Sequence, residues 1–219
     1  MLVAVVVRDA TTLSPVVGVR SEWLAWVGAA GWLAVAALGF GVWHAYDATP
    51  GPPAAAAEVA APPTGRWRVV TYLHPHCPCS LATVGELTGL VNDLGDPIDV
   101  EIVFVRPVGV PTGWERGRLW DRAAGLKWAN VRTDEGGAEV RAAGVTTSGQ
   151  AVVTDPDGRV VFRGGLSRGR GLAGDNSGRR AVAAWLAGDP HAPGSAPVFG
   201  CRLTTDDEGC ERGGGACPK

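Results

Sequence analysis

A long uncharged segment near the start of the chain restricts its architecture more than any other feature. The residues from Trp23 to Trp43 include no Asp, Glu, Lys or Arg. About 20 apolar residues are needed for a helix to cross a bilayer, and tryptophan is enriched at both membrane interfaces. The segment also lacks the polar stripe of a helix that packs on a soluble core. The sequence therefore predicts one transmembrane helix over 23–43.

Basic residues before and after this segment predict its orientation. Arg8 and Arg20 precede it, and the next Lys or Arg is Arg66. Because cytoplasmic flanks carry the excess of basic residues, we expect residues 1–22 in the cytoplasm and the rest of the chain outside. Abundant Gly and Ala with scarce Lys are typical of a GC-rich bacterial genome. Together with the apolar segment and its flanks, this composition indicates a single-pass protein of the bacterial inner (cytoplasmic) membrane with a periplasmic domain. A cleaved secretory signal ending near Ala55-Ala56-Ala57 is the alternative, and it also exports the domain.

The residues after the apolar segment favour a spacer and then a domain of ordinary size. Residues 44–65 are rich in Pro and Ala, which indicates a stiff, extended linker. The formal net charge is -2, so the basic footprint of a nucleic-acid-binding protein is missing and we expect no nucleic-acid partner.

Strand and helix patterns alternate through residues 66–188. The patterns predict strands over 66–73, 99–105, 128–131, 151–153 and 159–162, and helices over 80–94, 114–126, 139–143 and 179–187. Such alternation predicts an α/β domain with a parallel core sheet flanked by helices. The turn Asp155-Pro156-Asp157-Gly158 predicts that the last two strands form a hairpin and add an antiparallel edge. Residues 189–219 follow as a cysteine-containing tail.

Cys77 and Cys79 lie where the first predicted strand gives way to the first helix of this domain. Free backbone N–H groups and the helix dipole stabilise a thiolate at such a junction, and the thiolate is the nucleophile of disulfide exchange. Pro78 has no N–H to lose at a helix start. We therefore expect two accessible sulfurs that share an ionised state.

Two longer runs carry a resemblance to a known family. VVTYLHPHCPCSLATVGEL resembles the strand, active-site turn and first helix of the thioredoxin superfamily, and GVTTSGQAVVTDPDGRVVFRGG resembles its later loop, hairpin and glycine turn. The resemblance covers roughly Arg66 to Leu186 and is nearest to the membrane-tethered bacterial members. The His-Pro-His-Cys-Pro-Cys run and the tail from Pro197 to Cys201 are also similar to a group of exported proteins labelled RedB-like.

The resemblance implies a thioredoxin-like fold and a thiol–disulfide oxidoreductase with a redox-active centre at Cys77 and Cys79. It implies no cofactor, and it implies protein thiols or disulfides of the extracytoplasmic space as partners. The sequence departs from the family at two points. Only Pro78 separates the cysteines, so a disulfide between them should be strained and easily reduced. Gly149 stands where the family has a cis-proline, so the resemblance does not establish how a substrate backbone would dock against this loop.

Two other functions fit the same residues. His74, His76, Cys77 and Cys79 bring imidazole and thiolate ligands together, a combination that suits copper or zinc, and a copper or zinc binding or delivery module is the main alternative. If the strand continued through this run, His74 and His76 would point to the same face. A static disulfide or an inactive thioredoxin-like docking scaffold is the third possibility.

The three remaining cysteines, Cys201, Cys210 and Cys217, lie in the tail. The ordinary interpretation is a structural disulfide between Cys201 and Cys210 or Cys217, and sequence alone does not choose the pairing. The alternative is that the apolar pair Val198-Phe199 docks the tail on the domain, which would make Cys201 an accessory, resolving thiol.

Overall fold

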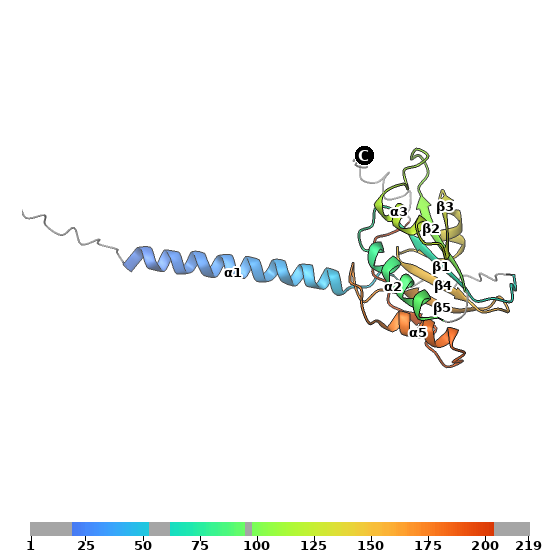
Figure 1. Cartoon of the computed structure of the whole chain (residues 1–219). Helices are drawn as coiled ribbons and strands as arrows, with labels where there is room; N and C mark the ends of the chain where they lie inside the picture. Colours follow the sequence, from blue (N-terminus) through green and yellow to red (C-terminus); the bar gives the residue numbers. More distant parts are fainter. Residues whose placement is uncertain (1–18, 53–61, 95–97, 204–219) are drawn as a thin grey trace, which may run out of the picture. The chain divides into compact units, whose positions relative to one another are not determined.

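The computed structural model describes residues 19–52, 62–94 and 98–203, which form two separate units, 1–46 and 47–219 (Figure 1). Four features of the sequence interpretation lie outside the described residues: Arg8, the segment Ala55–Ala57, Cys210 and Cys217.

The described residues of the first unit belong to a single long helix, α1 (Val19–Ala48). Within its part from Glu22 to Ala48, an 18-residue window has a mean hydropathy of 1.7, and none of that window is buried in the structure. By length and composition this helix can cross a membrane, in agreement with the predicted segment over 23–43.

The second unit is built on a six-stranded mixed sheet. The strands are β1 (Arg68–Leu73), β2 (Asp99–Arg106), β3 (Ala129–Glu135), β4 (Gln150–Thr154), β5 (Val160–Gly165) and β6 (Ser195–Ala196), in the order β3-β2-β1-β4-β5-β6. The strands β1, β2 and β3 are parallel, whereas β4 is antiparallel to β1 and to β5. The predicted parallel core and the predicted hairpin are therefore both confirmed.

Helices cover the two faces of this sheet unequally. The helices are α2 (Ser80–Asp93), α3 (Arg118–Ala124), α4 (Ala138–Ala142) and α5 (Ser177–Leu186). Side chains of α2, α3 and α5 pack in one hydrophobic cluster with the sheet, and α4 contributes to a second cluster on the other face. Figure 1 shows α2 and α5 side by side over the sheet. Their apolar spacing therefore creates the main core, as the sequence pattern predicted.

Two elements differ most from their predicted bounds. Helix α3 begins at Arg118 rather than at residue 114, because the preceding residues form turns that include Gly113 at a φ of 89°. Strand β3 continues to Glu135, beyond the expected end at residue 131. Its outer half is polar and has no hydrophobic alternation, but Glu135 pairs with Arg106 of β2 through an ion pair of 2.6 Å. Pairing across the ladder thus extends a strand that the sequence pattern ended early.

The sheet also extends beyond residue 188, the expected end of the domain. Strand β6 pairs with β5 in parallel, and Leu203 is buried in the second hydrophobic cluster. A Cβ at Gly165 would lie 2.5 Å from the carbonyl oxygen of Pro197, so the absence of a side chain there lets the tail approach the sheet. The first part of the tail is consequently a component of the fold.

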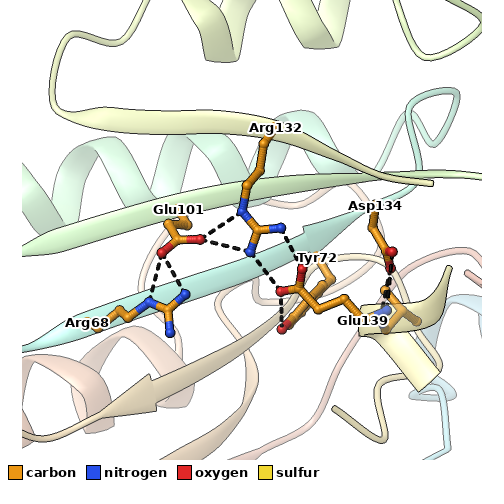
Figure 2. A network of polar contacts seen from close by, with 7 residues as sticks. Arg68, Tyr72, Glu101, Arg132, Asp134 and Glu139 are labelled. Carbon is orange, nitrogen blue, oxygen red and sulfur yellow. Dashed lines mark hydrogen bonds and ion pairs between the residues drawn. The ribbon is translucent and has the colours of Figure 1, made fainter. Parts of the chain in front are cut away.

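A network of charged side chains joins three strands on the α4 face of the sheet (Figure 2). Glu101 accepts hydrogen bonds from Arg68 at 2.8 Å and from Arg132 at 2.9 Å. Arg132 also pairs with Glu139 of α4, which accepts a third hydrogen bond from Tyr72 at 3.1 Å. Hydrogen bonding to Arg132 holds the pKa of Glu139 below its ordinary value, although burial opposes this. The network therefore fastens the short helix α4 to the sheet through ionised partners.

Candidate functional site

The two central cysteines lie in the turn that leads from β1 into α2. The N–H of Cys77 donates to the carbonyl of His74 at 3.1 Å, and the N–H of Ser80 donates to the carbonyl of Cys77 at 3.1 Å. Cys79 precedes the first residue of α2 with helical dihedral angles. The predicted position of both thiols at a strand-to-helix junction is therefore what the structure shows.

Cys77 has a polar environment although it is only 2% exposed. Its sulfur accepts hydrogen bonds from the thiol and the N–H of Cys201, from the hydroxyl of Ser80 and from the N–H of Cys79. Burial raises the pKa of Cys77, but these four donors outweigh burial and leave the pKa below its ordinary value. Cys77 is consequently a buried site for a thiolate, not an inert thiol in apolar packing.

The hydroxyl groups behind Cys77 form a directed chain of hydrogen bonds. Ser148 Oγ accepts from the N–H of His74 at 2.8 Å and lies 2.8 Å from Ser80 Oγ. Since Ser80 donates to Cys77, Ser148 donates its own proton to Ser80. Sequence reasoning missed both serines, because only the close approach of the start of α2 and the loop at Ser148 brings their hydroxyl groups together.

Cys79 is the accessible member of the pair. It is half-buried, and burial together with the neighbouring Cys77 raises its pKa, whereas the charge of Arg170 acts in the opposite direction. The expectation of two accessible sulfurs therefore holds for Cys79 and is wrong for Cys77. The two thiols are chemically distinct: Cys79 is partly exposed and protonated more readily, and Cys77 is buried and ionised more readily.

Cys201 joins this site from the tail. The N–H of Ser148 donates to the carbonyl of Cys201 at 2.8 Å, and the N–H of Leu203 donates to the carbonyl of Thr146 at 3.0 Å. Val198 is buried, so the predicted docking of the tail is confirmed for this residue. Burial and the neighbouring Cys77 raise the pKa of Cys201 to about 12. Of the sequence alternatives for Cys201, the structure places its thiol against Cys77, whereas the other two tail cysteines lie outside the described residues.

His74 and His76 contact an aromatic side chain. Strand β1 ends at Leu73, as the sequence predicted, so the two histidines lie in the turn and the condition under which they would share one face of a strand is not met. Their rings lie 5.6 Å and 4.4 Å from the ring of Trp114, and His76 Nε2 is 3.1 Å from the Trp114 carbonyl oxygen. Burial, followed by the nearby His76, lowers the pKa of His74. Within the described ranges, no three His, Cys, Asp or Glu side chains are grouped so that they could hold a metal ion.

The loop that faces the cysteines contains Gly149 where the family resemblance places a proline. The backbone of Gly149 is left-handed, with a φ of 91°, and its N–H donates to the carbonyl of Tyr72 at 2.8 Å. A Cβ at this position would lie 2.8 Å from Thr83 Oγ1 of α2. Glycine therefore satisfies both the dihedral angle and the close approach that bring Ser148 to the site.

The sheet order, the parallel and antiparallel pairings and the placement of two thiols at the start of α2 define a thioredoxin-like fold. Among solved structures, the chain is similar to an uncharacterized conserved protein from Geobacillus kaustophilus. The identity is 21%, the match covers 74% of this chain and 93% of that one, and the TM-score is 0.52.

Two further solved structures are more distant. A hypothetical protein from Sinorhizobium meliloti 1021 matches with 19% identity, 71% and 93% coverage of the two chains and a TM-score of 0.49. The pneumococcal exposed lipoprotein thioredoxin Etrx1 from Streptococcus pneumoniae matches with 17% identity, 57% and 86% coverage and a TM-score of 0.41. No protein-family model matches the chain, and no curated protein matches it.

Proposed function

We propose that the protein is an extracytoplasmic thiol–disulfide oxidoreductase, anchored by α1, whose redox pair is Cys77 and Cys79. The observation that carries the proposal is the contrast between the two thiols. Cys77 has four hydrogen-bond donors on its sulfur, while the neighbouring Cys79 is partly exposed. A stabilised thiolate next to an accessible thiol is the minimum that disulfide exchange requires.

The exposure of the two residues supports an order of events in the reduction of a partner. Cys79 first loses its proton to water, and its thiolate attacks the partner disulfide. A sulfur–sulfur bond forms to Cys79, and one partner thiolate leaves. The Cys77 thiolate then attacks Cys79 Sγ, which releases the second partner thiolate and leaves a Cys77–Cys79 disulfide. Two electrons pass from the pair to the partner, and the partner sulfurs take protons from water. The same steps in reverse would oxidise a dithiol partner.

The proposed location rests on α1 and on the distribution of basic residues. The part of α1 from Glu22 to Ala48 has the length and hydropathy of a membrane span. Arg20 precedes this part, and Arg66 is the next basic residue after it. We therefore place the domain on the periplasmic side of a bacterial inner membrane, where disulfides persist. The resemblance to membrane-tethered, RedB-like proteins in the Cys-Pro-Cys run supports the same placement.

The test combines redox poising with a turnover assay on the full-length protein in detergent. The protein is equilibrated in glutathione buffers, alkylated and mapped, and its reduction of a fluorescent disulfide-bonded peptide is followed. We expect a linkage that involves Cys77 and a turnover that Cys77→Ser and Cys79→Ser both abolish. Thr88→Ala, which alters a hydroxyl elsewhere on α2, is the matched control and should retain the turnover. A wild-type rate equal to that of buffer alone, or one unchanged by both cysteine substitutions, would reject the function.

A further inference from the structure

We propose that Cys201 is the third redox thiol of this site and that the stable oxidised form carries a Cys77–Cys201 disulfide, with Cys79 left as a free thiol. The inference rests on the proposed function and deepens it, because it assigns the final acceptor of the disulfide within the chain. It starts from a contact that the sequence does not reveal: both the thiol and the backbone N–H of Cys201 donate to Cys77 Sγ.

The segment that carries Cys201 is held in place from both sides. On one side it forms an antiparallel bridge, with Arg202 opposite Thr147. On the other side, Arg170 Nη1 donates to the carbonyl of Gly200 at 2.5 Å. A Cβ at Gly200 would lie 2.0 Å from the carbonyl oxygen of Ser148, so this approach requires glycine. The position of the Cys201 sulfur is therefore a product of the fold and not of a free tail.

The spacing of the cysteines favours Cys201 as the final partner of Cys77. A Cys77–Cys79 disulfide closes a small ring through Pro78, and strain makes such a bond reducible. A Cys77–Cys201 disulfide joins two segments that each contact the loop at Ser148, the tail through Cys201 and Arg202 and the turn through His74 and Ser80, so no small ring is closed. Because the strain of the small ring is released, transfer of the disulfide bond from Cys79 to Cys201 lowers the free energy of the protein.

The transfer is one balanced exchange step that follows the proposed reaction. The Cys201 thiolate attacks Cys77 Sγ, a sulfur–sulfur bond forms between Cys201 and Cys77, and the bond between Cys77 and Cys79 breaks. Cys79 leaves as a thiolate and takes up the proton that Cys201 has lost. The number of disulfides in the protein does not change, and the accessible thiol is regenerated.

The charges around the three sulfurs support this direction. Burial, followed by Cys77, raises the pKa of Cys201 in the reduced protein. Once Cys77 is part of a disulfide, its negative charge is gone, so Cys201 ionises more readily. Arg170 lowers the pKa of Cys79 and of Cys201 alike. The guanidinium thus stabilises both the attacking and the leaving thiolate.

The test is disulfide mapping of the full-length protein in detergent, with Cys210→Ser and Cys217→Ser introduced to remove the other tail thiols. The protein is oxidised with glutathione disulfide, free thiols are alkylated, and the linked peptides are identified by mass spectrometry. We expect a Cys77–Cys201 link with Cys79 alkylated, and we expect the same link in Cys79→Ser. In Cys201→Ser, a Cys77–Cys79 link should form and should be about tenfold or more easier to reduce with glutathione. A Cys77–Cys79 link alone in the protein that retains Cys201 would overturn the inference.

A pair of glycine variants tests the placement without changing any sulfur. Gly200→Ala should push the tail away from Ser148 and reduce the yield of the Cys77–Cys201 link. Gly85→Ala on α2, where a Cβ meets nothing within 4 Å, is the control and should keep the yield. Circular dichroism distinguishes a local displacement from unfolding, and a full yield in a folded Gly200→Ala protein would count against the inference.

The peptide-reduction assay separates the two proposals. Turnover that survives without a Cys77–Cys201 link rejects the role of Cys201 and retains the oxidoreductase. A Cys77–Cys201 link in a protein that has no turnover rejects the redox role of Cys201 together with the oxidoreductase, since the bond is then structural.

Discussion

Ser80 Oγ lies 2.8 Å from Ser148 Oγ, so a helix start and a loop from distant parts of the chain share one buried hydrogen bond next to Cys77. The N–H of His74 donates to the same Ser148 hydroxyl at 2.8 Å. Ser148 therefore donates its proton to Ser80, and Ser80 donates its own proton to the Cys77 sulfur. The site therefore stabilises negative charge with neutral donors and needs no basic side chain in contact with that sulfur.

Removal of the last hydroxyl in this chain should raise the pKa of Cys77. Ser80→Ala deletes one donor to the thiolate. The loss of a hydrogen bond to a charged group raises the pKa of that group by about one. Titration of the thiolate absorbance at 240 nm measures the change. Ser80→Thr keeps the hydroxyl and should restore the lower pKa. An unchanged titration curve in Ser80→Ala would contradict the role of the serine chain.

Cys79 should become more reactive when Cys77 is replaced. Burial and then Cys77 raise the pKa of Cys79, so Cys77→Ser removes the second cause and lowers this pKa toward the ordinary value of about 8.5. Alkylation of Cys79 by iodoacetamide should then proceed faster near pH 8 than in the wild type. The midpoint of the alkylation rate as a function of pH should also lie at a lower pH. In the comparison variant Cys201→Ser, which retains Cys77, the pKa of Cys79 should stay high. Equal rates in both variants would show that the two sulfurs do not interact.

The charged network on the α4 face should contribute to stability only above acidic pH. Glu139 has a lowered pKa, so its contribution is present above the unfolded value of about 4.3 and is lost as the pH falls through the folded value. We expect Glu139→Gln to lower the free energy of unfolding at pH 7 by about 1 kcal/mol, since the carboxylate is partly exposed. Urea titrations at pH 7 and pH 3 should show that the difference in unfolding free energy between the wild type and Glu139→Gln is smaller at pH 3.

A matched control for this prediction lies on the edge strand. Glu135 pairs with Arg106, but its side chain is 71% exposed, so Glu135→Gln should change stability by less than about 0.5 kcal/mol. A larger loss in Glu135→Gln than in Glu139→Gln would contradict the importance of the network.

A chain that begins at Asp47 should fold and remain in solution without detergent. The two units separate at this residue, and the shorter chain retains the contact of Gly51 with Val198 at 2.8 Å. Gel filtration and the thiolate titration provide the measurements. The full-length chain should require detergent, and the shorter one should keep the low pKa of Cys77. Aggregation of the shorter chain, or a normal Cys77 pKa in it, would contradict the separation.

Local patterns in the sequence predicted most of the fold. The periodicity of Val84, Leu87 and Leu90 predicted α2 because its hydrophobic spacing matches the helical repeat. The turn at Asp155-Pro156-Asp157-Gly158 predicted the hairpin of β4 and β5 because it joins two apolar runs. The polar half of β3 was missed, since its strand conformation depends on pairing with β2 rather than on its own residues.

For the functional site, the sequence by itself determined the position of Cys77 and Cys79 at the start of a helix, because a strand pattern, a proline and a helical repeat are local signals. Only the tertiary structure decided which thiol is covered, which serines serve it and where Cys201 lies. Those contacts depend on the approach of α2, the loop at Ser148 and the tail, which are far apart in the chain. Burial and hydrogen bonding act through space, so the opposite pKa changes of two neighbouring cysteines have no signature in the order of the residues.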